Sequence, residues 1–262
     1  MTELTIVDIT LLCILMSIKM AVIWSKTVDN TQYEVRLAGN TRRLYRDGVL
    51  HSAYNPSKPI SNNIWDLLFL PTLFHEESPK RVLILGVGGG VVIHLLNRFA
   101  QPKSIVGIEI DKTHIDIARK YFDLQDKNLQ LAHADAIDWL NKYKGPVFDL
   151  IIEDVFIEEA GEPLRLMHGD KQWLAVLRKN LSPNGTLVIN HATDSEARFT
   201  KKQATQYASC FQFSLPLLEN KVLALLKQSS SVAALNKRLE ADPSLLKLKQ
   251  QSKLDYSCRK IY

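Results

Sequence analysis

Cysteine is scarce in this sequence, with three residues in 262, and no two of them have C-x-x-C spacing. Cys13, Cys210 and Cys258 are far apart and odd in number. A disulfide framework or a cysteine-based zinc site needs paired cysteines, so the pattern argues against both. We expect a protein without a metal, located in the reducing cytoplasm.

A long hydrophobic run is also missing. Residues 9–18 are largely apolar, but Asp8 and Lys19 close the segment, and a membrane-spanning helix needs about 20 apolar residues. A signal peptide would need a basic front end, which this segment lacks. Three interpretations of the N-terminal extension, residues 1–23, stay open: an additional packed helix, a weak membrane contact, or sequence upstream of a true start at Met20. The non-membrane interpretations are favoured.

A large excess of one charge is absent too, since the net charge is only +5. Residues 236–262 carry seven basic and three acidic residues, or +4 of that total. Surfaces that bind nucleic acid interleave basic with aromatic side chains, and the two do not alternate here. We therefore expect no nucleic-acid partner and interpret residues 229–262 as a basic, solvated helical tail.

From residue 81 onward, apolar strand-like runs alternate with segments of helical periodicity. Residues 82–85 form a continuous apolar run, as a strand buried on both faces requires, and residues 92–99 repeat apolar side chains at helical spacing. This alternation predicts an α/β fold, a Rossmann-like, mostly parallel sheet with helices on both faces. Residues 211–227 predict an antiparallel hairpin at its C-terminal end.

Residues 33–54 alternate in the manner of strands and contain Asp47-Gly48, a dipeptide that favours a tight hairpin. They predict a small β-hairpin cap, followed by a short linking helix that Ser61 would cap and Pro71 would end. The expected domains are the apolar extension 1–23, the cap and linking helix 24–75, the Rossmann-like nucleoside-binding domain 76–228 and the tail 229–262.

Four features fall at the carboxyl ends of successive predicted strands, where open α/β sheets bind their ligands. The first is the glycine turn, residues 86–90, in which glycines let a ligand approach the backbone. The second is Glu109, about 20 residues further on, where a carboxylate can accept both hydroxyls of a ribose. Taken alone, the glycine turn could be a tight turn without a ligand, and Glu109 could be a solvent-facing acid. The two features together, at this spacing, favour ribose binding.

The third feature is Asp135-Ala136 after the third strand. Asp135 can accept from an adenine amino group while the small Ala136 leaves room for the base; the alternative is that Asp135 only caps the next helix. The fourth is Asp154 after the fourth strand, where it would face the reacting end of the nucleoside and hold an amine or accept a proton. Asp154 is therefore the candidate catalytic residue, and a loop acid without a role is the alternative.

With these positions in place, the order of motifs resembles the spermidine synthase (polyamine aminopropyltransferase) family and, more broadly, class I S-adenosylmethionine-dependent methyltransferases. The stretches that carry it are GVGGGV at 86–91, IVGIEID at 105–111, DA at 135–136 and DVFIE at 154–158. The resemblance implies a methyltransferase fold and S-adenosylmethionine or its decarboxylated form as group donor. The donor contacts that it implies are Gly86, Gly88, Gly90, Glu109, Ile110, Asp135, Ala136 and Asp154. A small-molecule acceptor is also implied, for which an amine is one candidate, and a homodimer is left open.

The departures from the family pattern fall on the part that binds the amine. Gly89 stands where the family has the turn aspartate that holds the aminopropyl amine, and Ile157 stands at the second acid of its D-S-S-D motif. An acid and a tyrosine that precede the family's linking helix are missing from residues 59–63. Binding a doubly charged diamine in a partly dry site needs carboxylates. The glutamates between 153 and 162 could supply substitute charge, although a solvated acidic loop is favoured.

The resulting hypothesis is a spermidine synthase-like transferase that moves a methyl or aminopropyl group from its donor to a small acceptor, with an activity that has diverged from ordinary spermidine synthesis. One alternative is a non-catalytic nucleoside-binding or interaction protein, which the eroded acceptor site favours. The other is an NAD-dependent oxidoreductase, which Val91 at the last position of G-x-G-x-x-G disfavours. His168 and His191 are further candidate bases for which a structural role is favoured.

Overall fold

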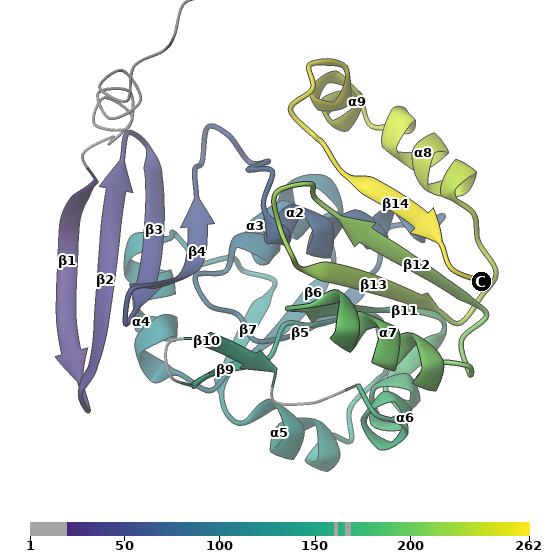
Figure 1. Cartoon of the computed structure of the whole chain (residues 1–262), viewed down its shortest axis with the longest axis horizontal. Coiled ribbons are helices and arrows are strands. Elements are labelled where there is room, and N and C mark those ends of the chain that lie inside the picture. The colour runs from purple at the N-terminus through teal and green to yellow at the C-terminus, as the bar shows by residue number, and fades with distance from the viewer. Residues whose placement is uncertain (1–19, 160–161, 166–168) are drawn as a thin grey trace, which may run out of the picture.

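The computed structural model describes residues 20–159, 162–165 and 169–262. Figure 1 shows a four-stranded sheet beside an eight-stranded sheet that is flanked by helices. This α/β arrangement confirms the predicted fold class. Predictions on residues 1–19 and on His168 lie outside the described residues. Within the described part of the chain, no helix is long and apolar enough to cross a membrane.

The smaller sheet, the cap, is antiparallel and follows the order of the sequence. Its strands are β1 (Ala21–Val28), β2 (Thr31–Ala38), β3 (Thr41–Arg46) and β4 (Val49–Tyr54). Asp47 and Gly48 turn between β3 and β4 with φ of 46° and 82°, as the predicted tight hairpin requires. The predicted boundary after residue 23 is wrong, since β1 already begins at Ala21. Because β1 is an edge strand with mostly exposed side chains, no apolar alternation revealed it.

The segment that links cap and main sheet contains α2 (Ile64–Phe69) and the 3-10 helix η1 (Leu70–Phe74). Asn63 caps α2, so the prediction of Ser61 is wrong. Asn63 and Asp66 form a capping box, in which the Asp66 side chain accepts from the backbone N–H groups of Asn63 and Ser61. The α-helix ends at Phe69, just before Pro71, as predicted, and Pro71 lies in the first turn of the 3-10 helix η1, where its missing N–H costs nothing.

The main sheet has the order β14-β12-β13-β11-β8-β5-β6-β7. Its strands are β5 (Arg81–Leu85), β6 (Ser104–Glu109), β7 (Leu129–His133), β8 (Phe148–Glu153), β11 (Leu181–His191), β12 (Ser209–Ser214), β13 (Lys221–Leu226) and β14 (Ser257–Lys260). The strands from β7 to β11 in this order are parallel, and β12 and β13 form the predicted antiparallel hairpin. Because the chain leaves β5 towards β6 on one side and reaches β8 on the other, the topological switch point lies beside β5.

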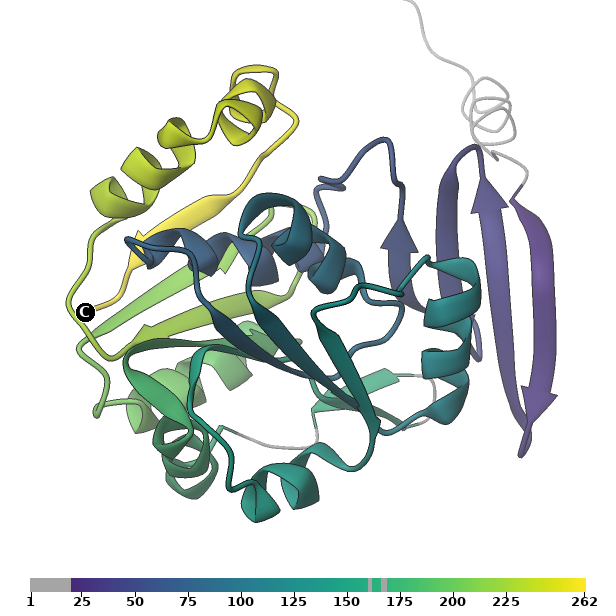
Figure 2. The same cartoon turned by 180° about the vertical axis from the view of Figure 1, so that it is seen from behind.

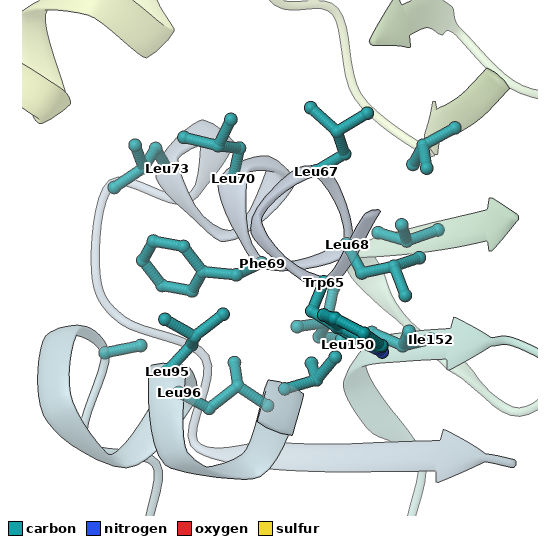
Figure 3. Close-up of a cluster of buried hydrophobic side chains, with 14 of the residues drawn as sticks. Trp65, Leu67, Leu68, Phe69, Leu70, Leu73, Leu95, Leu96, Leu150 and Ile152 are labelled. Carbon is teal, nitrogen blue, oxygen red and sulfur yellow. The ribbon is translucent and has the colours of Figure 1, made fainter. Parts of the chain in front are cut away.

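Helices cover both faces of this sheet, as predicted. One face packs on α2, η1, α3 (Val91–Phe99), α8 (Val232–Ala241) and α9 (Pro243–Gln250), and the other on α5 (Ala136–Lys142), α6 (Lys171–Lys179) and α7 (Asp194–Gln203). Figure 3 shows the core of the first face, where Trp65 and Leu68 of α2 lie beside Leu150 and Ile152 of β8. The helix α4 (Lys112–Tyr121) carries Ile117, which packs with Tyr33, Val35 and Leu44 of the cap.

A separate ribbon and the C-terminal segment complete the chain. The ribbon pairs β9 (Phe156–Glu159) with β10 (Glu162–Arg165) directly after β8. Residues 229–262 contain helices, α8 and α9, as predicted, but the expectation of a solvated tail is wrong: α8 and α9 bury Leu235, Leu239 and Leu245, and β14 pairs antiparallel with β12. Because β14 has only four residues, mostly exposed, its sequence gave no strand signal. This segment and the cap lie on opposite sides of the molecule (Figure 1 and Figure 2).

Candidate active site

A cavity of about 320 Å³ lies at the carboxyl ends of β5, β6, β7 and β8, bordered by β4 and the start of α2. Of the predicted donor-binding residues, all but Gly90 line it: Gly86, Gly88, Glu109, Ile110, Asp135, Ala136 and Asp154. Another cavity of about 330 Å³, lined in part by residues 75–80, lies at the amino ends of β5 and β8. Open parallel sheets bind ligands at the carboxyl ends, so the first cavity is the candidate active site.

Every backbone N–H of the glycine turn is hydrogen-bonded within the chain. The N–H of Gly86 donates to the carbonyl oxygen of Ile108, and the N–H groups of Val87 and Gly88 both donate to Glu109 Oε2. The N–H of Gly89 donates to Ser52 Oγ, and that of Gly90 donates to the carbonyl oxygen of Val87. These donor–acceptor distances are 2.7–2.9 Å. A turn that holds a pyrophosphate or a carboxylate uses such N–H groups as donors. The N–H donors of this turn are therefore already committed to the chain itself, although Gly86, Val87 and Gly88 line the cavity.

Glu109 ends β6 and is 6% exposed. Its Oε2 accepts from Val87 and Gly88, and its Oε1 accepts from the N–H of Asp111 at 3.0 Å. A carboxylate has about four lone-pair positions, so one on Oε1 is left for a ligand. The structure thus adds a role that the sequence did not predict, holding the turn in shape. Ribose binding by Glu109 stays a prediction, and one lone-pair position on its carboxylate is left for it.

The three turn glycines with positive φ differ in what surrounds them. Gly86, with φ 83°, lets the turn approach the backbone after β8, since a Cβ there would lie 2.2 Å from the carbonyl oxygen of Asp154. Gly88, with φ 53°, faces the cavity. Gly90, with φ 80°, is the N-cap of α3, and a Cβ there would lie 2.7 Å from the Leu124 side chain. Gly90 is therefore a packing position behind the cavity.

The predicted base-binding residues lie together at the ends of β6 and β7. Asp135 caps α5, with Oδ1 accepting from the N–H of Asp138 at 2.9 Å, and it also lines the cavity. The two alternatives weighed for it are therefore compatible. Ala136 is buried at the first position of α5, and Ile110 is 61% exposed at the cavity rim. An apolar rim beside a carboxylate suits a flat base that carries an amino group.

Asp154 follows β8 and belongs to a chain of polar side chains. Its Oδ1 accepts from Asn190 Nδ2 at 2.8 Å, and Asn190 Oδ1 accepts from Asn220 Nδ2 at 3.2 Å. All three residues line the cavity. Asn190 comes from β11 and Asn220 from the turn before β13, so three strand ends meet here. The amides fix one oxygen of the candidate catalytic carboxylate.

A second polar cluster, which the sequence did not predict, joins the cap to α4. The Tyr33 hydroxyl donates to Asp111 Oδ2 at 2.6 Å, and burial raises the pKa of Tyr33 to about 12. His114 is 4% exposed, and its ring nitrogens lie 3.8 Å from carboxylate oxygens of Glu109 and Asp111. Its ring centroid is 5.0 Å from that of His51, whose pKa burial lowers to about 4. His51 therefore places a neutral imidazole in the cavity wall.

Sequence reasoning missed Ser52, His114, Asn190 and Asn220. Asn190 had a usable signal, because it follows the fifth predicted strand and the strand-end rule applies to it. Only the docking of the other elements brings His114 of α4 and Asn220 of a hairpin turn to the cavity, and Ser52 of β4 to the glycine turn behind it. The candidate base His191 is fully buried, with Nε2 2.8 Å from Thr200 Oγ1, and has the structural role that was favoured. In the part of the chain that the structure describes, no three His, Cys, Asp or Glu side chains are grouped to hold a metal ion.

The fold and this cavity define the class of protein: an α/β domain of the methyltransferase type with its site at the switch point. A family model described as "Spermine/spermidine synthase domain" matches residues 66–233. The chain belongs to this family, which confirms the resemblance seen in the sequence.

Curated relatives match parts of the chain. Polyamine aminopropyltransferase 2 of Caldanaerobacter subterraneus subsp. tengcongensis is 32% identical over 130 residues, 48% of this chain and 42% of its own length. The polyamine aminopropyltransferase of Vibrio vulnificus is 30% identical over 186 residues, 68% of this chain and 60% of its own length. The matches thus span about two fifths to three fifths of these relatives.

Solved structures share the fold. Spermidine synthase from Thermotoga maritima has a TM-score of 0.63 at 18% identity, covering 81% of this chain and 75% of its own. Human methyltransferase-like protein 13, in complex with SAH, has a TM-score of 0.57 at 21% identity, covering 70% of this chain and 90% of its own.

Proposed function

We propose that this chain is an aminopropyltransferase that takes decarboxylated S-adenosylmethionine as donor and a small amine as acceptor. The observation that carries the proposal is the complete internal bonding of the N–H groups of the glycine turn. An NAD pyrophosphate, or the carboxylate of intact S-adenosylmethionine, would need donors that the turn no longer has. A donor without an anionic group suits this site better. The names of the curated relatives support the same activity.

The residues around the cavity divide the donor between them. The backbone of Gly86 and Gly88, which lines the cavity, lies at the sulfonium end of the donor, and Glu109 has one lone-pair position for a ribose hydroxyl. Asp135 accepts from the adenine amino group, while Ile110 and Ala136 cover the base. Asp154 lines the cavity next to Gly86, and in this proposal the aminopropyl group and the acceptor meet beside its carboxylate.

The transfer is a displacement at carbon. The lone pair of the acceptor nitrogen attacks the aminopropyl carbon beside the sulfonium, so a C–N bond forms and the C–S bond breaks. The electron pair of the broken bond stays on sulfur, which leaves as methylthioadenosine. Before the attack, the acceptor ammonium gives a proton to Asp154, which frees the lone pair of the nitrogen, and the product keeps its positive charge on that nitrogen. Asn190 holds the Asp154 carboxylate in place. Most of the rate enhancement comes from orienting the two reactants.

Calorimetric titration with decarboxylated S-adenosylmethionine, S-adenosylmethionine, methylthioadenosine and NAD tests the donor. We expect the decarboxylated form to bind and intact S-adenosylmethionine to bind roughly tenfold or more weakly, since an unsatisfied buried carboxylate costs more than about 1.4 kcal/mol. NAD should not bind. Tighter binding of S-adenosylmethionine together with methyl transfer would replace this proposal with a methyltransferase.

Release of methylthioadenosine in the presence of an amine tests the transfer step. Asp154→Asn should lower turnover roughly 100-fold or more while leaving donor binding measurable, because it removes the proton acceptor and keeps the shape. The matched control is Asp138→Asn, an exposed acid on α5 that pairs with Lys142. Donor binding without any release of methylthioadenosine, for every amine tried, would instead establish a non-catalytic binding protein.

A further inference from the structure

His114 lies in the wall of the candidate active site with unused hydrogen-bonding capacity. It is near the start of α4, is 4% exposed, and lines the same cavity as Glu109. Its Nδ1 is 3.8 Å from Glu109 Oε1 and its Nε2 is 3.8 Å from Asp111 Oδ2, and both distances are longer than a hydrogen bond. Nε2 is buried without a hydrogen-bond partner among the described residues. Because buried polar groups are nearly always paired, such a ring in a cavity wall points to a ligand.

The His114 ring is held in place from three directions. Asp111 caps α4, and its Oδ1 accepts from the backbone N–H of His114 at 3.2 Å. The Tyr33 ring of the cap packs edge-on against it, with centroids 5.7 Å apart, and the centroid of the His51 ring is 5.0 Å away. The Tyr33 hydroxyl also donates to Asp111 Oδ2, which ties the cap to α4 beside the ring. A side chain fixed in this way loses little conformational freedom when a ligand binds.

The space between Glu109 and His114 suits the two hydroxyls of one sugar. Glu109 Oε1 accepts from the N–H of Asp111 and has one lone-pair position left, so it can accept one ribose hydroxyl. The second hydroxyl of a ribose is on the adjacent carbon, and His114 Nδ1 is only 3.8 Å from Oε1. A hydroxyl both donates and accepts, so it can pair with Nδ1 whether or not that nitrogen carries the ring proton.

We propose that His114 is a donor-binding residue that holds one hydroxyl of the ribose while Glu109 holds the other. The pair then selects a nucleoside with an intact cis-diol. The sequence alone predicted that Glu109 would hold both hydroxyls, and the structure transfers one of them to α4. This inference rests on the proposed function, because it concerns the donor of that same site.

Calorimetric titrations with methylthioadenosine and with its 2′-deoxy and 3′-deoxy analogues test the two ribose contacts. In the wild type, we expect each missing hydroxyl to weaken binding about tenfold, the size of one hydrogen bond to a buried partner. If either analogue binds as tightly as methylthioadenosine, the inference is overturned, because one hydroxyl then has no partner. If methylthioadenosine itself does not bind at millimolar concentration, the proposed function fails, and this inference with it.

Two substitutions at His114 connect one hydroxyl to the ring. Leucine removes both nitrogens, so His114→Leu should bind methylthioadenosine about tenfold more weakly, and should bind one of the two analogues as tightly as the wild type binds it. Asparagine carries a side-chain amide at the position of Nδ1, so His114→Asn should restore discrimination against that analogue. The matched control is His75→Leu, which removes another buried imidazole with an unpartnered Nε2, outside this cavity. The affinities of His75→Leu should equal those of the wild type.

Two results would overturn the role of His114. One is a folded His114→Leu protein that discriminates against both analogues as strongly as the wild type. The other is an equal loss of affinity in His75→Leu, which would mean that the loss of a buried imidazole acts through stability alone. The Tm of each variant is measured alongside. If His114→Leu does not fold, the titrations of the wild type and of His114→Asn still decide between the outcomes.

Discussion

Gly86 and Gly48 have almost the same backbone conformation, with φ of 83° and 82°, but very different surroundings. A Cβ on Gly86 would lie 2.2 Å from the carbonyl oxygen of Asp154, and one on Gly48 would meet nothing within 4 Å. Substituting each glycine by alanine therefore separates two destabilising effects. Both variants strain a residue with positive φ, and only the one at Gly86 also disturbs the close approach of the turn to the Asp154 backbone.

Gly86→Ala should destabilise the protein by about 2 kcal/mol or more beyond Gly48→Ala, because only the first variant adds a clash to the strained φ of about 1–2 kcal/mol. Chemical denaturation of both variants measures this difference. Equal losses would mean that the turn can move away from Asp154 without cost, and that the approach of the two strand ends is not fixed.

At the level of single residues, the sequence predicted which carboxylates line the cavity better than it predicted their hydrogen-bond partners. Glu109, Asp135 and Asp154 follow strands, and the ends of parallel strands meet at one edge, so the sequence sufficed to bring them to one cavity. What each carboxylate binds could not be predicted, because that depends on distances of a few ångströms. The roles of these residues in catalysis and donor binding stay predictions that the titrations above test.

Among the elements, α2 carries a buried carboxyl group in its capping box. Asp66 of its capping box is 1% exposed, and burial raises its pKa to about 6. In an unfolded chain an aspartate titrates near about 3.9, so folding favours the neutral form. The stability that this proton contributes is fully present below the unfolded pKa and is lost as the pH rises through about 6.

Asp66→Asn should therefore improve in stability relative to the wild type as the pH rises from 4.5 to 7, by roughly 1–3 kcal/mol. The amide is neutral throughout and keeps an oxygen for the N–H groups of Ser61 and Asn63. Urea denaturation at both pH values measures the change, with the exposed Asp138→Asn as control. A difference between variant and wild type that is the same at both pH values would contradict the raised pKa.

The helix α2 was predicted from its sequence, but its N-cap residue was not. The apolar face of residues 64–68 predicted a helix, and α2 is there. Ser61 and Asn63 are both acceptable cap residues, and only the hydrogen bonds of Asp66 distinguish them. The edge strands β1 and β14 were not predicted either. Their side chains are mostly exposed, so their sequences lack the apolar alternation from which a strand is predicted.

For the whole molecule, the C-terminal segment closes the edge of the main sheet. The strand β14 pairs with β12, and beyond it the backbone N–H of Ile261 donates to the carbonyl oxygen of Cys210 at 2.7 Å. Without this segment, β12 would be an unpaired edge next to a buried core. Such edges pair with other chains and promote aggregation.

A chain that stops after Asp255 should lose at least about 2 kcal/mol of stability, since each hydrogen bond contributes a net ~0.5–1.5 kcal/mol and several are removed. It should also self-associate as concentration rises. Denaturation and size-exclusion chromatography measure the two effects. The control is Arg259→Ala with Lys260→Ala, which keeps the strand backbone and removes the charges. A truncated chain as stable and monomeric as the control would show that residues 256–262 are dispensable.

The sequence by itself determined the alternation of strands and helices, and with it the parallel sheet, the cavity edge and the family. These follow from periodicity and from residues next to one another in the chain, so no long-range contact is needed to infer them. Tertiary structure alone decided that Ser52, 37 residues before Gly89, fills the space above the glycine turn, and that Glu109 holds the same turn. Contacts of that kind arise from how the cap docks on the sheet. The sequence records which residues are present and leaves their mutual distances to packing.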